Sequence, residues 1–360
     1  MGAPTPGVFL TWNDSRRSAT LARTLGVERV TLVAQRNGPL RHPAGAAATA
    51  RWLFAARPRL VWFQFSLALG VVLAVYQRLA RGRGVRLAVD VHSKALRRSG
   101  PWWLRWAVLP VKRWAFASCH AVLVSNEVDA RYAEEVLRAP ALILPDPLPE
   151  PPVASAAEWQ GGGQVVFVCS YDVDEPVPLI LEAARRIAPH ATVVLTGDTR
   201  PLDPGLRAEL ERVATLPGRL PEAEYWGLLR GAGCIVVLTT DTACLPCGAY
   251  EAIVLGKRPV LASDPTRERV FGEAGVFAEL SADGVADAVL GVLERGRQGE
   301  GPAVPAAFRA RWVDTWRSVR ARLMELGIAG AEAWGPEGEP AVVPRADGGR
   351  QRLEGTRGVA

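Results

Sequence analysis

The chain has 360 residues, 49% of them hydrophobic, which is enough to bury the cores of two ordinary domains. Its five cysteines exclude a disulfide scaffold, and the N-terminus lacks a basic segment followed by an apolar one. We therefore expect a protein of the reducing cytoplasm. Its formal net charge is +6.

The charge is unevenly distributed along the chain. Residues 1–150 hold 21 Lys and Arg and 9 Asp and Glu, a net charge of +12, whereas residues 151–360 hold 22 and 28, a net charge of −6. A basic first half suits an anionic membrane surface or a phosphate-bearing acceptor. Nucleic acid is not an expected partner, because no nucleic-acid-binding signature accompanies the charge.

Strand and helix patterns alternate along the first 150 residues, which is typical of a parallel sheet covered on both faces. The expected strands are Val8–Thr11, Arg29–Ala34, Arg59–Phe65, Arg86–Asp90, Ala121–Ser125 and Ala141–Leu144. The expected helices are Ser18–Leu25, Ala44–Phe54, Leu69–Ala80, Trp102–Ala117 and Glu127–Leu137. Residues 60–76 are the most apolar stretch, but they divide into a strand and a helix, and a membrane span needs roughly 20 apolar residues.

Polar residues follow several of these strands, and open α/β sheets bind their ligands at such positions. Arg16 and Arg17 come after the first strand and are suited to holding an anion. His92 follows the strand that ends at Asp90, so it could hydrogen-bond a ligand or be satisfied within its own loop. Asn126 occupies a similar strand end.

Residues 94–114 interleave four tryptophans with six basic residues. A basic aromatic surface of this kind can lie in a membrane interface, and Pro101 and Pro110 are expected to break the segment. The alternative is a helix with its tryptophans in the core and its arginines in water. The residues expected at the membrane or the acceptor are Trp102, Trp103, Trp106, Arg97 and Arg98.

Residues 151–163 are rich in Pro, Ala and Gly and are expected to form a linker. A second α/β series follows over residues 164–307. Its expected elements are strands Gln164–Cys169 and Ala191–Thr196 and helices Val177–Ile187, Gly205–Val213, Glu222–Gly231 and Gly284–Arg295. An amphipathic helix pattern covers residues 308–326, and residues 327–360 are expected to be disordered.

Residues 235–265 read IVVLTTDTACLPCGAYEAIVLGKRPVLASDP, a buried strand, a Gly/Pro loop, a short helix and a second buried strand. The loop lets main chain approach a ligand, and the N-terminus of a helix attracts phosphate, so this pattern predicts a nucleotide pocket. Alternatively, Glu251 simply favours the positive end of the helix. Cys244 and Cys247 have the spacing of a zinc or redox pair, but no second pair completes a metal site, and we expect no metal.

The segment CLPCGAYEAIVLGKRPVLASD resembles the donor-nucleotide motif of glycosyltransferase family 4. The resemblance is specific within this motif and extends loosely over residues 7–326. It implies the α/β GT-B fold, in which two Rossmann-like open parallel-sheet domains face each other across a cleft. The final helix, residues 308–326, would then pack back toward the first domain. The family also implies a retaining glycosyltransferase whose nucleotide-sugar donor is a substrate, with no cofactor.

The resemblance assigns roles to several residues of the motif. Glu251 would bind the ribose of the donor, and the main chain around Gly248 and Ala249 would face its diphosphate. The family commonly has a second Glu eight residues earlier, but this chain has Ala243 there. Its nearest polar substitutes are Asp241 and Thr242.

A second departure follows the first strand of the second domain. The family usually has an Arg or Lys pair there for the diphosphate, whereas CSYDVDEP places acidic residues at 172–175. We expect these to cap the helix that starts near Pro176 or to contact acceptor or sugar hydroxyls, with a bound metal as the alternative. Arg267 and Arg269, or Arg16 and Arg17 from the other domain, would supply the positive charge. Ser170 and Gly197 are further candidate donor residues, and residues 217–220 fit a base-binding loop.

These observations predict a glycosyltransferase that moves a sugar to a lipid-linked or glycan acceptor, in cell-surface polysaccharide or glycolipid synthesis. His92 and Asp241 are the candidate catalytic residues. The enzyme would lie on the inner face of the cell membrane as a peripheral protein. Two alternatives stay open: a non-catalytic GT-B-shaped scaffold at the membrane, and a sugar-nucleotide epimerase, which needs no acceptor.

Overall fold

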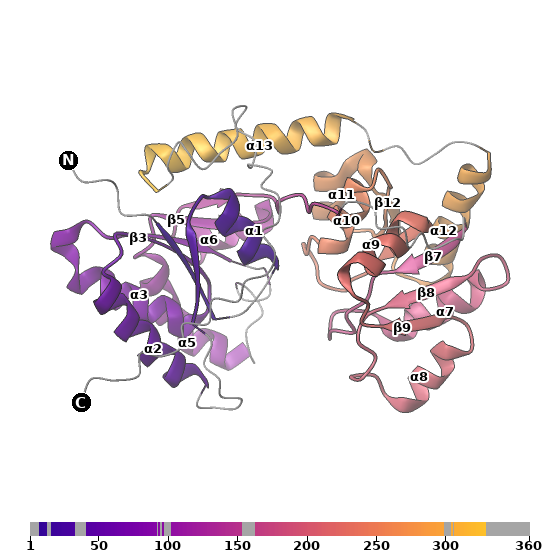
Figure 1. Ribbon diagram of the computed structural model, residues 1–360, viewed down its shortest axis with the longest axis horizontal. Coiled ribbons are helices and arrows are strands. Elements are labelled where there is room, and N and C mark those ends of the chain that lie inside the picture. The colour runs from indigo at the N-terminus through magenta and orange to yellow at the C-terminus, as the bar shows by residue number, and fades with distance from the viewer. Residues whose placement is uncertain are drawn as a thin grey trace.

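The computed structural model describes residues 7–12, 16–32, 41–91, 93, 96, 102–152, 163–298, 304 and 306–328. Two α/β domains lie side by side, and a long C-terminal helix runs along them (Figure 1). The side chains of residues 16, 17, 20, 41 and 102 lie outside the described part.

The first domain is built on a parallel sheet of six strands in the order β2-β1-β3-β4-β5-β6. The strands are β1 Val8–Thr11, β2 Glu28–Thr31, β3 Leu60–Gln64, β4 Arg86–Asp90, β5 Ala121–Val124 and β6 Ala141–Ile143. The helices between them are α1 Arg16–Thr24, α2 Arg41–Ala56, α3 Leu67–Leu79, α5 Trp102–Phe116 and α6 Glu127–Glu135. The chain reverses its direction across the sheet between β1 and β3, where an open sheet presents a crevice.

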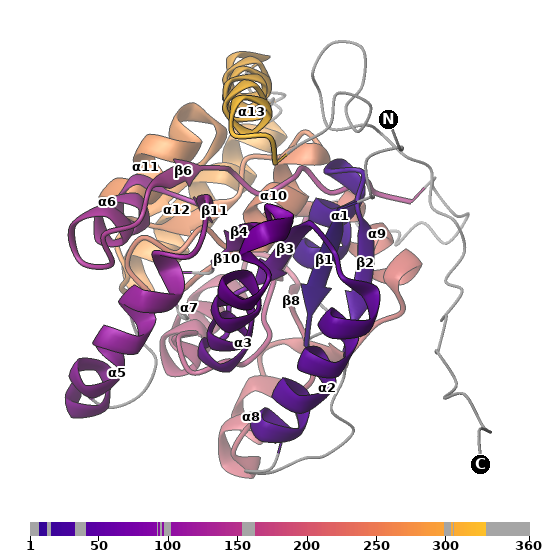
Figure 2. The same ribbon diagram turned by 90° about the vertical axis from the view of Figure 1, so that its left-hand side faces the viewer.

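Both faces of this sheet are buried because successive strand residues point to opposite sides. Val8 and Leu10 pack with residues of α2, α3 and α5, which lie on one side of the sheet in Figure 2. Phe9 and Trp62 pack on the other side with α1 and with the C-terminal helix α13, Ala306–Glu325. Trp316 of α13 is fully buried in this second layer.

The second domain has a parallel sheet in the order β12-β11-β10-β7-β8-β9. Its strands are β7 Gln164–Phe167, β8 Val193–Thr196, β9 Thr215–Gly218, β10 Ala232–Val237, β11 Val260–Ala262 and β12 Val276–Ala278. Its helices are α7 Val177–Ile187, α8 Pro204–Glu211, α9 Glu222–Gly231, α10 Cys247–Val254, α11 Pro265–Phe271 and α12 Ala282–Arg297. The crevice of this sheet lies between β7 and β10, and the loops after these two strands together with α10 carry most of the candidate donor residues.

The helix α13 joins the two domains. Phe308 near its start stacks on Phe271 of the second domain, with ring centroids 6.3 Å apart. Further along, Trp312 and Trp316 pack on the first sheet, and the Trp312 indole N–H donates to the carbonyl of Asp146 at 3.0 Å. This helix therefore fixes the second domain beside the first.

Several elements differ from the sequence-based expectations. The helix α11 and strand β12 were not predicted, and β9 covers part of the predicted loop 217–220. Pro110 was predicted to break the segment, but it lies inside the continuous helix α5. Pro101, the other predicted break, lies outside the described residues. The prediction of a disordered tail over residues 327–360 is wrong at its start, because Ile328 is buried against α13. Residues 329–360 lie outside the described residues, as do 153–162 of the predicted linker. No described helix is long and apolar enough to cross a membrane.

Candidate functional site

The domains meet where β5 and β10 end. The Asn126 side chain, directly after β5, donates to the carbonyl of Ala243, which follows β10, at 2.8 Å. Next to it, Arg269 of α11 forms an ion pair with Glu127 of α6. Because the carboxyl ends of strands in both sheets take part, the contact lies where open α/β sheets bind ligands.

The helix α10 begins close to the sheet. A Cβ at Gly248 would lie 2.9 Å from Val168 Cγ1 and 3.2 Å from Val237 Cγ2, so only glycine lets the helix start at this distance. Gly248 and Ala249 are buried, and the Ala249 N–H donates to Pro246 at 3.0 Å. Cys247, the first helical residue, is exposed. The exposed residue at the start of the helix is therefore Cys247, one residue before Gly248, where the contact with the diphosphate was predicted.

Glu251 is the fifth residue of α10, and its exposed fraction is 7%. The Tyr225 hydroxyl of α9 donates to its carboxylate. A buried carboxylate needs such donors, since an uncompensated charge would be costly there. Glu251 is thus a largely buried hydrogen-bond acceptor. Its carboxylate can accept from a ligand while it also accepts from Tyr225.

The loop 241–244, between β10 and α10, is held from behind. Arg267 of α11 is 3% exposed, and its guanidinium donates to the carbonyls of Ala262 at 2.7 Å, Asp241 at 2.9 Å and Cys244 at 3.2 Å. Burial lowers the pKa of Arg267, while neighbouring carboxylates, Asp264 first, raise it. Arg267 therefore braces the loop, and the phosphate role predicted for it has no support from this position.

Within that loop, the predicted polar substitutes occupy different surroundings. Asp241 is 1% exposed and Thr242 is exposed. Ala243 has a left-handed φ of 61°, which residues with a Cβ rarely adopt. Asp264, the N-cap of α11, accepts from the Ala243 N–H at 3.4 Å.

The acidic segment after β7 does not cap α7, so the first of the two roles predicted for it is wrong. The Glu175 carboxylate accepts from the Ser170 N–H at 2.9 Å, the Ser170 hydroxyl at 2.6 Å and the Tyr171 N–H at 2.8 Å. No side chain caps α7 at Pro176. Glu175 instead closes a turn in which Tyr171 has a φ of 57°. Ser170 was predicted to bind the nucleotide-sugar donor, but its N–H and hydroxyl are hydrogen-bonded to Glu175 within the turn.

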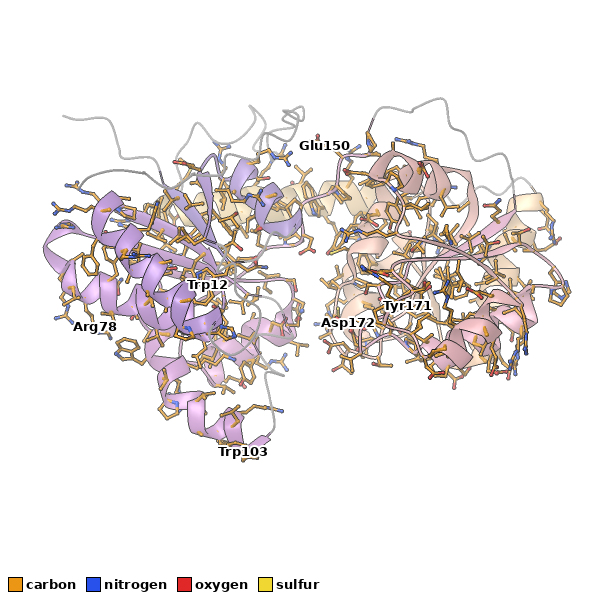
Figure 3. The ribbon with its side chains drawn as sticks, turned by 60° about the horizontal axis from the view of Figure 1, so that its bottom comes forward. Trp12, Arg78, Trp103, Glu150, Tyr171 and Asp172 are labelled. Atoms are coloured by element: carbon orange, nitrogen blue, oxygen red, sulfur yellow. The ribbon has the colours of Figure 1, made fainter. Side chains whose placement is uncertain are left out.

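Asp174 links the two loops of the crevice. Its carboxylate accepts from the Thr239 hydroxyl at 2.9 Å, and its carbonyl accepts from the Thr240 N–H at 2.7 Å. Asp174, Asp241 and Cys244 each offer an atom within 4.8 Å of the others, an arrangement that could hold a cation. Arg267 lies beside Asp241 and Cys244 and already provides positive charge there. Figure 3 shows Asp172 at the side of the second domain that faces the first.

Gly197 directly follows β8 and has a φ of 105°, and a Cβ there would lie 2.3 Å from the carbonyl oxygen of Cys169. Only glycine permits this close approach between the loops after β7 and β8. The neighbouring Asp198 accepts hydrogen bonds from Arg200, which lower its pKa to about 2. An anionic Asp198 therefore borders the place where the resemblance puts the nucleotide base.

The first domain supplies fewer described candidates. The main chain of Arg16 and Arg17 starts α1 directly beyond β1, and their side chains lie outside the described part. His92, Arg97 and Arg98 lie outside the described residues, as does the side chain of Trp102. Trp103 and Trp106 are 58% and 69% exposed on α5.

Two contacts of this site were not predicted. Tyr225 is 26 residues from Glu251 in sequence, and Asn126 is 117 residues from Ala243. No spacing rule connects residues so far apart. The strand-end position of Asn126 was the one available signal, and it did not indicate a contact with the other domain.

Comparisons with known proteins agree with this architecture. Residues 6–147 match the model of the glycosyl transferase 4-like domain. A search of curated protein sequences finds no match. The first domain therefore confirms the resemblance to glycosyltransferase family 4 that the donor motif suggested.

Solved structures resemble the chain over nearly its whole length. The Anabaena protein Alr3699/HepE, solved in complex with UDP and glucose, has 13% identity and a TM-score of 0.70, covering 89% of this chain and 100% of that one. A glycosyltransferase from Rickettsia africae has 7% identity and a TM-score of 0.66, covering 90% and 98%. A putative UDP-N-acetylglucosamine 2-epimerase from Listeria monocytogenes has 10% identity and a TM-score of 0.57, covering 90% and 97%. These likenesses confirm the predicted GT-B fold.

Proposed function

We propose that this chain, a GT-B protein whose first domain is a glycosyl transferase 4-like domain, transfers a sugar from a nucleotide-diphosphate sugar to an acceptor. The observation that carries the proposal is Glu251. It is a buried carboxylate on α10, beside the crevice of the second sheet, and a tyrosine hydroxyl donates to it. A carboxylate of this kind can accept hydrogen bonds from two ribose hydroxyls.

The remaining chemistry would be positioning and electrostatics. The exposed start of α10 at Cys247 would place the positive end of the helix at the diphosphate. His92 and Asp241 are the proposed groups near the reacting carbon, and Arg16 and Arg17 the proposed cations. Retention of configuration and the absence of a metal are part of the proposal. Arg267 supports the second point, because it balances the acidic loop without a metal.

The proposal is tested with a panel of UDP, GDP and their sugars. We expect one nucleotide to bind by calorimetry and its sugar to be hydrolysed slowly in the absence of an acceptor, at an unchanged rate in EDTA. UDP is the first choice, because HepE was solved with UDP. If no nucleotide binds, the proposal is wrong and the non-catalytic scaffold, which Ala243 and the acidic turn favour, takes its place.

A sugar-nucleotide epimerase is the second candidate, and its support is the similar fold of the Listeria protein. An epimerase inverts one carbon of the sugar and leaves the glycosidic bond to phosphate in place at equilibrium. Proton NMR of the incubated donor separates the two reactions. A new sugar nucleotide without free nucleotide diphosphate indicates epimerisation, whereas release of the diphosphate indicates transfer to water.

We also propose a lipid-linked acceptor in cell-surface glycan synthesis and a peripheral position on the inner face of the cell membrane. The helix α5 supports this, because Trp103, Leu104 and Trp106 are exposed at its start around the basic Arg105. Figure 3 places Trp103 at the outer end of the first domain. Trp114 at the other end of α5 is instead covered by the Arg78 guanidinium, 4.4 Å from its ring.

The membrane contact predicts a result in vesicle flotation. We expect the wild type to float with vesicles that contain anionic lipid, and the double variant Trp103→Ala/Trp106→Ala to float at least several-fold less, because two interfacial anchors are lost. Met324→Ala is the control, since Met324 is also exposed but lies on α13. Equal flotation of the double variant and the wild type would leave the membrane proposal without support.

A further inference from the structure

The donor loop of the second domain is also held by the first domain, through Asn126. This residue is 1% exposed and is the N-cap of α6. Its Oδ1 accepts from the Asp129 N–H at 2.9 Å, while its Nδ2 donates to the Asp129 carboxylate at 3.0 Å and to the Ala243 carbonyl at 2.8 Å. The contact thus crosses from one domain to the other.

The neighbours of Asn126 fix the orientation of its amide. The Asp129 N–H requires an acceptor, and the Asp129 carboxylate and the Ala243 carbonyl both require donors. A flipped amide would place an oxygen against two acceptors. The amide nitrogen is therefore directed to its own helix and to the donor loop, with the Ser125 hydroxyl as a more distant third acceptor at 3.3 Å.

The accepting carbonyl is itself fixed. Ala243 has its left-handed φ, and its N–H is held by Asp264. On the far side of the loop, Arg267 holds the carbonyls of Asp241 and Cys244. Among the described residues of the first domain, Asn126 is the one with a hydrogen bond to the main chain of this loop. The main chain of loop 241–244 is therefore hydrogen-bonded by Arg267 of its own domain and by the Asn126 amide of the other domain.

The same network reaches the end of β4. The Ser93 hydroxyl donates to the Asp129 carboxylate, which also accepts from Asn126. Ser93 and Asp129 are both buried. Ser93, which follows β4, and the donor loop are thus joined through the buried side chains of Asp129 and Asn126.

We propose that Asn126 is a positioning residue, which sets loop 241–244 for the sugar part of the donor once the two domains are docked. The inference rests on the proposed function. The loop lies where the resemblance places a sugar-contacting Glu, and Ala243 cannot make that contact with its side chain. The nucleotide part of the donor would bind within the second domain, so Asn126 acts on the sugar and on turnover and leaves nucleotide affinity unchanged.

The variant Asn126→Ser tests this, because serine preserves the N-cap but is too short to reach Ala243. With UDP and UDP-glucose as probes, we expect the Kd for UDP to change less than about twofold and kcat for UDP-glucose hydrolysis to fall about tenfold, as for one lost buried hydrogen bond. The preference for UDP-glucose over UDP should fall as well. Arg131→Ser, an exposed change on α6, is the matched control and should behave as the wild type.

Each outcome decides the proposal. If Asn126→Ser matches the wild type in kcat and preference, Asn126 is only a helix cap and the inference is wrong, while the proposed function stands. If the wild type binds none of UDP, GDP and their sugars, the proposed function fails and the inference fails with it; if it binds GDP, then GDP and its sugar are the probes. If Asn126→Ser does not fold, Asn126→Thr also preserves the cap and is too short to reach Ala243. Loss of the folded state in both variants, seen by circular dichroism, would identify a structural residue and overturn the proposal.

Discussion

Replacing Glu251 by glutamine should weaken nucleotide binding by about 1.5–3 kcal/mol, or about ten- to a hundredfold in Kd, because hydrogen bonds to a charged group are lost. Glutamine has nearly the same shape and can still accept from the Tyr225 hydroxyl. The thermal unfolding midpoint should therefore stay close to that of the wild type. Calorimetric titration with UDP and a thermal scan of the same sample measure both quantities.

Two further variants show whether the effect belongs to this carboxylate. Glu224→Gln removes an equal charge from the exposed side of α9 and should leave the Kd unchanged. Tyr225→Phe removes the donor to Glu251 and should have a smaller effect than Glu251→Gln, because the carboxylate can still accept from ribose. An unchanged Kd in Glu251→Gln for every nucleotide of the panel would remove the ribose role of Glu251.

The central strands were predictable because each is a short apolar run, buried on both faces by helices. β9 was not, since its sequence Thr-Leu-Pro-Gly contains two turn residues and it lies at the edge of its sheet. The helix α11 has a start signal that was overlooked: Asp264 caps it and Pro265 is its first residue. With seven residues, it is too short for a periodic pattern to show.

The candidate site was predictable where its geometry is local. Glu251 and Gly248 belong to one strand–loop–helix unit, so their spacing alone places them at the crevice. The acidic turn after β7 was misread, because its folding depends on the left-handed Tyr171 and on the reach of Glu175 back to Ser170. Asn126 could not be assigned, because its partner belongs to another domain and the docking of two domains is not encoded in a local pattern.

The departure from the family motif at position 243 involves both a local sequence change and contacts between distant residues. A missing side chain at position 243 is visible in the sequence. At this position the main-chain carbonyl of Ala243 has a fixed direction, which depends on a φ angle, on Arg267 and on Asn126. The local sequence therefore identifies the missing side chain, and only the assembled fold shows how the main chain is held there.

Replacing Arg267 by leucine should lower the free energy of unfolding by about 3–5 kcal/mol, because three buried carbonyls lose their donor. Arg267→Lys should recover only part of this loss, since one ammonium group cannot bridge three carbonyls as a planar guanidinium does. Urea unfolding followed by circular dichroism measures both changes.

Arg269→Leu is the matched control, two residues away on the same helix. Its side chain is 62% exposed and pairs with Glu127 at the surface, so its loss should cost no more than about 1 kcal/mol. If Arg267→Leu were as stable as Arg269→Leu, loop 241–244 would not depend on this brace. The fixed direction of the Ala243 carbonyl would then depend on Asn126 and Asp264.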